Sequence, residues 1–176
     1  MPKISLSQTN AFKLCEDGTC DEPKEKTGER LECKKTDKCK DKGCYCQLFQ
    51  RGKKAGADDP WDVTPIDGTD ETTKKPDLDY KCICVRPILP EGYTLCDKPL
   101  CRLSEVDDPS TKPKTATVEC SGKCDDPCEC NLFRLHVKPK DADKKAAAKW
   151  DFVAKPGEKV DRKKDYYYRC FCSKKA

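Results

Sequence analysis

The chain has few of the residues on which catalytic sites depend and little of the apolar material on which large cores depend. Its 176 residues include one His and one Met, and the hydrophobic class makes up 35% of the sequence against 39% for charged residues. Apolar burial alone would leave such a chain near the disordered class. We therefore expect no single large hydrophobic core, and other interactions must hold the chain together.

Long apolar runs and charge of one sign are also missing. The apolar stretches are fragments such as Ile88-Leu89, far short of the ~20 residues that a membrane helix needs, so we expect no membrane span. No apolar leader follows Met1, which favours the mature form of a secreted protein. Residues 1–90 carry equal numbers of acidic and basic side chains, and the net charge of +4 comes from residues 91–176. Because no basic stripe is interleaved with aromatics, we expect no nucleic-acid partner.

A catalytic set cannot be assembled from these residues. His136 is the only His, and the alternating segment 132–137 around it is typical of a strand. Adjacent carboxylates such as Asp107-Asp108 precede a proline and are explained better as turn starters than as calcium ligands or a glycosidase pair. The chain has no C-x2-C pair of a zinc ribbon, and its 13 aromatic residues are untypical of a thiolate cluster. We therefore predict a protein that is not an enzyme and has no cofactor and no metal.

Cysteine is what the chain has in abundance. An even number of closely spaced cysteines is typical of extracellular proteins, where disulfides persist and stabilise each fold by roughly 2–4 kcal/mol per bridge. We therefore expect a secreted, extracellular protein in which every cysteine is bridged. The 16 cysteines are Cys15, Cys20, Cys33, Cys39, Cys44, Cys46, Cys82, Cys84, Cys96, Cys101, Cys120, Cys124, Cys128, Cys130, Cys170 and Cys172.

The spacing of these cysteines repeats. Consecutive cysteines are separated by 4, 12, 5, 4, 1, 35 and 1 residues in the first half and by 4, 18, 3, 3, 1, 39 and 1 in the second. We interpret this as a tandem duplication of an eight-Cys module, with module boundaries at 1–88 and 89–176. We expect four bridges within each module, none between them, and modules that fold separately. The pairing stays open, because eight cysteines permit 105 connectivities.

Local patterns predict a small disulfide-rich fold that is mainly β with a short helix. Segments 44–49 and 80–85 combine Cys-X-Cys with aromatic and branched residues, which is typical of strands. Both sulfurs of a Cys-X-Cys strand share one face, and an extended i, i+2 pair is too far apart to form a bridge. Residues 141–150 combine an N-cap candidate with strong helix formers, which predicts the helix.

Each long interval between cysteines carries one Trp-Asp pair. Trp61 and Trp150 admit two interpretations: a core anchor that packs on the disulfides, which the size of the indole favours, or a surface that contacts a partner. We retain both residues as candidates for a partner surface.

One short segment carries a resemblance to a known family. Cys96-Asp97-Lys98-Pro99-Leu100-Cys101-Arg102-Leu103-Ser104 resembles the segment that leads into a reactive loop in cereal Bowman–Birk inhibitors, which are secreted, double-headed and disulfide-rich. The resemblance implies an inhibitory loop at Arg102, Leu103 and Ser104, with Leu103 at the primary specificity position and a chymotrypsin-like protease as the target. The interval of 18 residues before Cys120 is longer than the loop of that family.

These patterns favour a binding protein. Cross-links that hold loops in one conformation lower the entropy cost of binding and resist cleavage, which is the physical basis of protease inhibition. We expect a protein partner, with a protease leading. The alternative is a secreted host-defence or receptor-binding interaction protein without inhibitory activity. The oligomeric state stays open.

Overall fold

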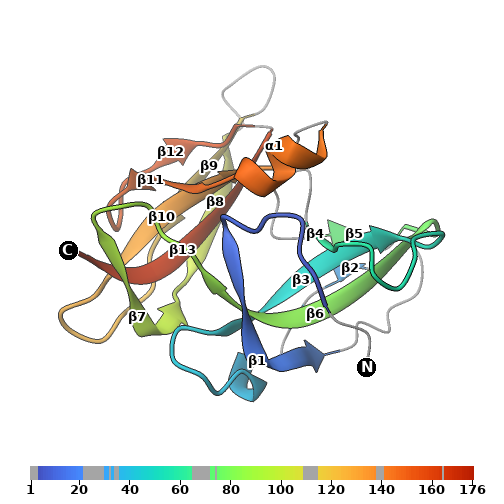
Figure 1. Ribbon diagram of the computed structural model, residues 1–176. Helices are drawn as coiled ribbons and strands as arrows, with labels where there is room; N and C mark the ends of the chain where they lie inside the picture. The colour runs from blue at the N-terminus through green and yellow to red at the C-terminus, as the bar shows by residue number, and fades with distance from the viewer. Residues whose placement is uncertain are drawn as a thin grey trace.

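A computed structural model shows how the chain is arranged (Figure 1). It describes residues 4–21, 30–31, 33, 36–64, 72–73, 75–108, 115–137, 141–163 and 165–176. These residues form a mainly β structure with one short α-helix, which confirms the predicted fold class. The elements are β1 (Phe12–Asp21), β2 (Arg30–Leu31), the 3-10 helix η1 (Thr36–Lys38), β3 (Tyr45–Gly52), β4 (Asp62–Val63), β5 (Thr72–Thr73), β6 (Leu78–Pro87), β7 (Tyr93–Leu100), β8 (Leu103–Asp108), β9 (Thr115–Cys120), β10 (Glu129–His136), α1 (Ala142–Ala147), β11 (Trp150–Ala154), β12 (Val160–Asp161) and β13 (Tyr166–Lys175).

Each half of the chain builds a four-stranded antiparallel sheet with the same order. The first sheet runs β1-β6-β3-β4 and the second runs β7-β13-β10-β11. In both sheets the two central strands carry the Cys-X-Cys motifs, with Cys46 opposite Cys84 and Cys130 opposite Cys172. The common order supports the duplication that the cysteine spacing predicts. Two smaller sheets, β12-β9-β8 and β2-β5, complete the described strands.

The edge strand β1 and its counterpart β7 share an irregularity. In β1 the register with β6 jumps between Leu14 and Thr19, and in β7 the register with β13 jumps between Leu95 and Leu100. Each bulge therefore starts at the first cysteine of its half. A bulge of this kind ends regular pairing and turns side chains away from the sheet.

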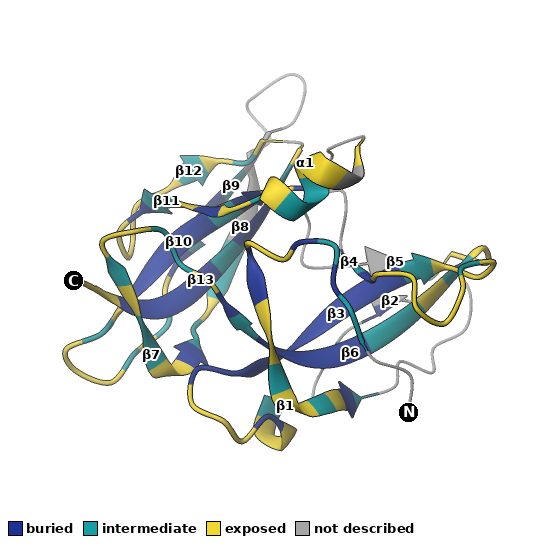
Figure 2. Ribbon diagram, in the orientation of Figure 1, coloured by how far each residue is buried: buried dark blue, intermediate teal, exposed yellow. Residues whose placement is uncertain are grey.

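The two faces of each sheet pack against different material. On β3, Tyr45 and Phe49 belong to an apolar cluster, whereas Cys46 and Leu48 on the other face belong to a cluster of disulfides. Side chains alternate between the faces of a strand, so buried strands supply both clusters at once. Figure 2 shows the result: the central strands β3, β6, β10 and β13 are mostly buried, and α1 is largely exposed.

The apolar cluster is shared by the two halves. Phe12 of β1 packs edge-on against Trp150 of β11, with ring centroids 5.7 Å apart, and Tyr45 packs on Phe171 at the same distance. We expected no single large core, and the described residues form three clusters: one disulfide cluster in each half and this aromatic one between them. Sequence patterns describe each half alone and therefore miss a core that the halves form together.

Polar contacts also join the halves. The Trp150 indole N–H donates to the carbonyl oxygen of Ala11 at 3.1 Å, and the Gln47 amide donates to the hydroxyl of Tyr167 at 3.3 Å. The Trp150 indole is buried, so its bond satisfies a donor that would otherwise lose its water partner. The Gln47 amide also donates to the carbonyl oxygens of Leu48 and Thr64, and its bond to Tyr167 extends this buried network across the halves. The halves are thereby fixed in one relative orientation.

The predicted helix at 141–150 is confirmed in part. Helix α1 covers only Ala142–Ala147, and Trp150 already belongs to β11. Asp141 stands at the N-cap position without a side-chain capping bond. The helix ends early because Trp150 is drawn into the shared core as a strand residue.

Candidate functional site

Eight disulfides use all 16 cysteines, four in each half. The pairing order is first to fifth, second to sixth, third to seventh and fourth to eighth in both halves. No bridge joins the halves and none closes within a Cys-X-Cys motif, as predicted. The bridges are Cys15–Cys44, Cys20–Cys46, Cys33–Cys82 and Cys39–Cys84 in the first half and Cys96–Cys128, Cys101–Cys130, Cys120–Cys170 and Cys124–Cys172 in the second.

The candidate inhibitory segment is part of a sheet. Leu103 and Ser104 begin β8, and their backbone pairs with the end of β9. The Leu103 side chain is half-buried and packs on the disulfide cluster of the second half. The Ser104 hydroxyl lies 3.1 Å from that of Ser121. A specificity residue has to enter a protease pocket, and Leu103 is partly engaged with its own protein.

Arg102 is the exposed side chain of this segment. The preceding residue, Cys101, forms a disulfide with Cys130. The carbonyl oxygen of Arg102 accepts a hydrogen bond from the Ser121 N–H at 2.9 Å. Gly122 lies so close to the Arg102 backbone that a Cβ on this glycine would stand 2.3 Å from the Arg102 backbone nitrogen. The Cys101–Cys130 bridge and the Ser121–Gly122 backbone therefore fix the backbone at Arg102, while the guanidinium is exposed to solvent.

The two tryptophans lie in the core. Trp61 is 5% exposed and Trp150 is 1% exposed, and both belong to the shared aromatic cluster. The guanidinium of Arg51 covers the Trp61 ring, with its carbon 4.1 Å from the ring centroid. Neither indole offers a surface to a partner in this structure, and the interpretation as core anchors agrees with their burial.

His136 stands at the exposed end of β10. Its ring packs on Tyr166, with centroids 5.2 Å apart, and the guanidinium of Arg134 lies over the same Tyr166 ring. Within the described part of the chain, no hydrogen bond joins His136 to a serine, cysteine or carboxylate. Its environment therefore matches the strand position that the sequence predicts.

Sulfur atoms gather in both disulfide clusters. Four groups of three cysteine sulfurs lie within 4.8 Å of one another, and every sulfur in them belongs to a bridge. A metal is bound by the thiolate, which a bridged cysteine does not have. In the oxidised protein these sulfurs therefore have no thiolate to offer to a metal.

A groove of about 400 Å³ lies where the halves meet. The segment around η1 forms one wall and the bulge of β7 forms the other. Its floor is apolar, from Pro99, Leu100 and bridged sulfurs, and its rim carries three carboxylates and three ammonium groups. The lining residues are Thr36, Asp37, Cys39, Lys40, Asp41, Lys42, Cys44, Asp97, Lys98, Pro99 and Leu100.

A backbone contact joins the two walls of the groove. The Gly43 N–H donates to the Asp97 carbonyl oxygen at 2.8 Å. Within the first half, the Arg86 side chain donates to the Lys42 carbonyl oxygen at 3.0 Å and holds the residue before Gly43. Gly43 has a φ of +79°, and a Cβ there would stand 3.0 Å from the Leu95 side chain. Only glycine combines this conformation with so close an approach. Sequence reasoning missed this site, because the glycine just before Cys44 does not show which segment of the other half it meets.

A second pocket of about 380 Å³ lies within the second half. The bridge Cys96–Cys128 lines it, and both of these cysteines are half-buried. Charged groups of both signs surround the bridge, so the pocket favours no ligand of one charge. The lining residues are Thr94, Leu95, Cys96, Asp97, Lys98, Asp125, Asp126, Cys128 and Lys174.

Comparison with known proteins adds no relative: no protein-family model, no curated protein and no solved structure matches this chain. Among the described residues, no helix has the length and apolar character needed to cross a membrane.

Proposed function

We propose that this is a secreted binding protein that acts by occupying the surface of a partner protein. The observation that carries the proposal is the combination of eight bridges with a core shared by both halves. Bridges fix the loops of each half, and the shared core fixes the halves against each other. A surface ordered in advance loses little conformational entropy on binding, so modest contact areas suffice for affinity.

Inhibition of a protease is the leading form of this function. Its support is the resemblance at Cys96 to Ser104, the bridge at Cys101 and the exposed side chain of Arg102. The resemblance favours Leu103 as the specificity residue, whereas exposure favours Arg102. The two choices predict different targets, since a basic residue suits a trypsin-like pocket and Leu suits a chymotrypsin-like one.

An interaction function without inhibition is the second candidate. The groove between the halves favours it, because an apolar floor with a rim of alternating charge suits an extended peptide with an apolar side chain between charged neighbours. The rim lysines Lys42 and Lys98 would then contribute to binding. Lys155, an exposed lysine on a turn of the second half, is a matched control.

The experiment is a protease panel with the oxidised full-length chain. Trypsin-like, chymotrypsin-like and cysteine proteases are assayed on small substrates with a micromolar excess of this protein, and the chain is checked for cleavage near Arg102. If Arg102 is the specificity residue, Arg102→Leu should move inhibition from trypsin-like to chymotrypsin-like enzymes. If Leu103 is the specificity residue, Leu103→Arg should move inhibition in the opposite direction.

The groove is tested by binding of extended peptides that carry an apolar residue between charged neighbours. Lys42→Glu with Lys98→Glu should weaken this binding at least about tenfold, which corresponds to about 1.4 kcal/mol, and Lys155→Glu should leave it unchanged. Absence of inhibition across the panel would reject the inhibitor and leave the interaction protein as the account of this fold.

A further inference from the structure

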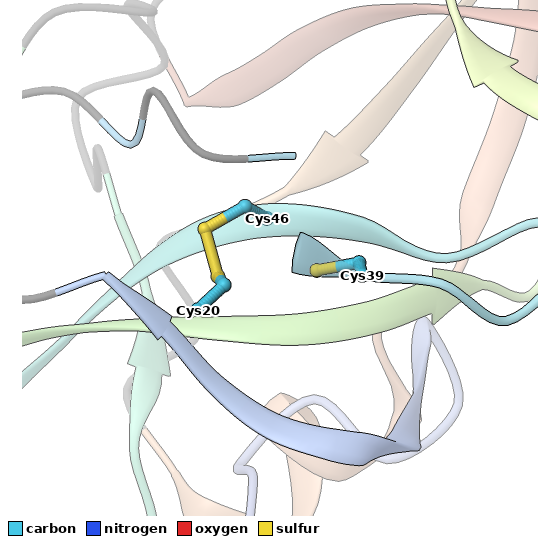
Figure 3. A group of neighbouring side chains, drawn as sticks. All are labelled: Cys20, Cys39 and Cys46. Atoms are coloured by element: carbon cyan, nitrogen blue, oxygen red, sulfur yellow. A yellow bond between two sulfur atoms is a disulfide. The ribbon is translucent and has the colours of Figure 1, made fainter. Parts of the chain in front are cut away.

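Three of the four disulfides in each half form a row, in which sulfurs of the middle bridge lie within 4.8 Å of sulfurs of each outer bridge. In the first half, the sulfur of Cys46 lies within 4.8 Å of those of Cys33 and Cys82, and Cys20, Cys39 and Cys46 form a second group with the same limit. The bridge Cys20–Cys46 is therefore the middle member of a stack. Figure 3 shows the sulfur of Cys39 directed toward this bridge.

The second half repeats the stack. The sulfur of Cys130 lies within 4.8 Å of those of Cys120 and Cys170, and the sulfur of Cys101 lies within 4.8 Å of those of Cys124 and Cys172. The bridge Cys101–Cys130 is thus again in the middle. The arrangement follows from the Cys-X-Cys strands, which place sulfurs on one face at a spacing of two residues.

Access to the two stacks differs. In the first half, Cys33 is the half-buried member of the stack and the other five sulfurs belong to buried cysteines. In the second half, Cys101 and Cys124 are both half-buried and belong to one group of sulfurs. Their inner partners Cys130 and Cys172 are buried. The second stack therefore offers a small thiol two adjacent half-buried cysteines, whereas the first stack offers one.

We propose that the second stack is a site of covalent modification by small monothiols of the glutathione class. The thiolate of the monothiol attacks the Cys124 sulfur, which forms a mixed disulfide there and releases the Cys172 thiolate. That thiolate attacks Cys101, forms a Cys101–Cys172 bridge and releases the Cys130 thiolate. Cys130 in turn attacks one sulfur of the Cys120–Cys170 bridge, forms a new bridge with that sulfur and releases the other as a thiolate.

Each step breaks one S–S bond and forms one, so the number of disulfide bonds is conserved. The electron pair of the broken bond leaves with the departing thiolate, and the last thiolate takes a proton from solvent. Attack through a mixed disulfide at an adjacent sulfur is the ordinary route of thiol–disulfide exchange. The stack thus carries one adduct at an accessible sulfur while the free thiol moves to a buried one.

The bridge Cys96–Cys128 provides an internal control. Both of its cysteines are half-buried, and neither belongs to a group of adjacent sulfurs. If exposure alone governs the chemistry, a monothiol should open this bridge as readily as Cys124–Cys172. The freed thiol would then stay on Cys96 or Cys128.

In the test, the oxidised full-length chain is treated with reduced glutathione, and free thiols are trapped with an alkylating reagent at increasing times. Peptide mass mapping then locates the glutathione adducts and the alkylated cysteines. The expected result is glutathione on Cys124, with alkylation that starts at Cys172 and spreads to Cys130, Cys120 and Cys170. Alkylation that stays on Cys172 at all times would overturn the proposal, as would adducts confined to Cys96 and Cys128.

Paired variants separate migration from local opening. Cys101→Ser with Cys130→Ser removes the middle bridge, and alkylation should then be lost from Cys120 and Cys170 while glutathione still adds at Cys124. Cys96→Ser with Cys128→Ser should leave the spread unchanged. If the first variant fails to fold, the time course of alkylation in the unaltered chain distinguishes migration of the thiol from local opening of one bridge.

Discussion

The indole nitrogen of Trp150 donates a hydrogen bond to the carbonyl oxygen of Ala11 across the two halves of the chain, at 3.1 Å. The same ring packs edge-on against Phe12, beside that carbonyl. One side chain from a long interval of the second half therefore anchors the first strand of the first half. A set of contacts of this kind turns two cross-linked modules into one body.

Loss of this anchor should destabilise the whole protein. Trp150→Ala removes a nearly fully buried indole and leaves the Ala11 carbonyl with the Ile88 N–H as its remaining donor, so we expect the free energy of unfolding to fall by about 3–5 kcal/mol, mainly through the lost packing. Denaturant unfolding with the bridges intact measures it. Leu14→Ala, at a side chain 39% exposed, should change stability by no more than about 0.5 kcal/mol. Equal effects of the two substitutions would contradict a shared core.

Separated halves should bind each other. Fragments 1–88 and 89–176 each contain a complete set of cysteines, and we expect each to form its own four bridges. Each fragment alone exposes its side of the aromatic cluster, so equimolar fragments should form a one-to-one complex in sedimentation experiments. The fragment 89–176 with Trp150→Ala should bind more weakly. Fragments that stay monomeric when mixed, or that give scrambled bridges, are the opposing results.

The backbone near Arg102 should tolerate no side chain at Gly122. A Cβ on Gly122 would stand 2.3 Å from the Arg102 backbone nitrogen and 2.9 Å from the Cys101 Cβ. Gly122→Ala therefore has to displace the backbone of Cys101 and Arg102. We expect a loss of about 1–3 kcal/mol from overpacking and a larger share of misbridged species during oxidative refolding. Gly52→Ala, where a Cβ meets open space, is the matched control and should refold as the unaltered chain does. Normal refolding of Gly122→Ala would show that the segment is not held as described.

Alkaline pH should weaken the first half through Tyr80. Burial raises the pKa of the Tyr80 hydroxyl, Asp77 adds to the rise, and the hydrogen bond from the Lys75 N–H opposes it. The folded form thus keeps this proton more tightly than the unfolded chain. Its contribution to stability is complete below about pH 10 and is lost as the pH rises through the raised pKa. Tyr80→Phe should lose less stability between about pH 8 and pH 11 than the unaltered chain. An identical loss in both would contradict this assignment.

Much of the local architecture could be predicted from the sequence because cysteine spacing is a local signal. The strands around Cys46 and Cys84, the confinement of bridges to each half and the helix before Trp150 all follow from residue types and intervals. The pairing order could not be predicted, since many connectivities satisfy the same intervals. It is decided by which sulfurs the bulged edge strands and the central strands bring together.

The functional residues were harder to predict, for a different reason. The resemblance at Leu103 describes the sequence of a loop, but Leu103 belongs to a strand because its backbone pairs with β9. The groove at Gly43 and Asp97 depends on how two halves meet, and no interval within one half contains that information. Sequence patterns within one half therefore give the least information about the interface between the halves.

A disulfide map of the oxidised chain tests the central claim most directly, because the common arrangement of the two halves, the stacks and the rigid surface all rest on the pairing order. Eight bridges lower the intact mass by about 16 Da relative to the reduced chain, as each bridge removes two hydrogens. Peptide mapping without reduction should then find Cys15–Cys44 and Cys96–Cys128 as equivalent first pairs, followed by the other six in the same order. A different order in the two halves, a bridge between them or free thiols in the native protein would contradict the account.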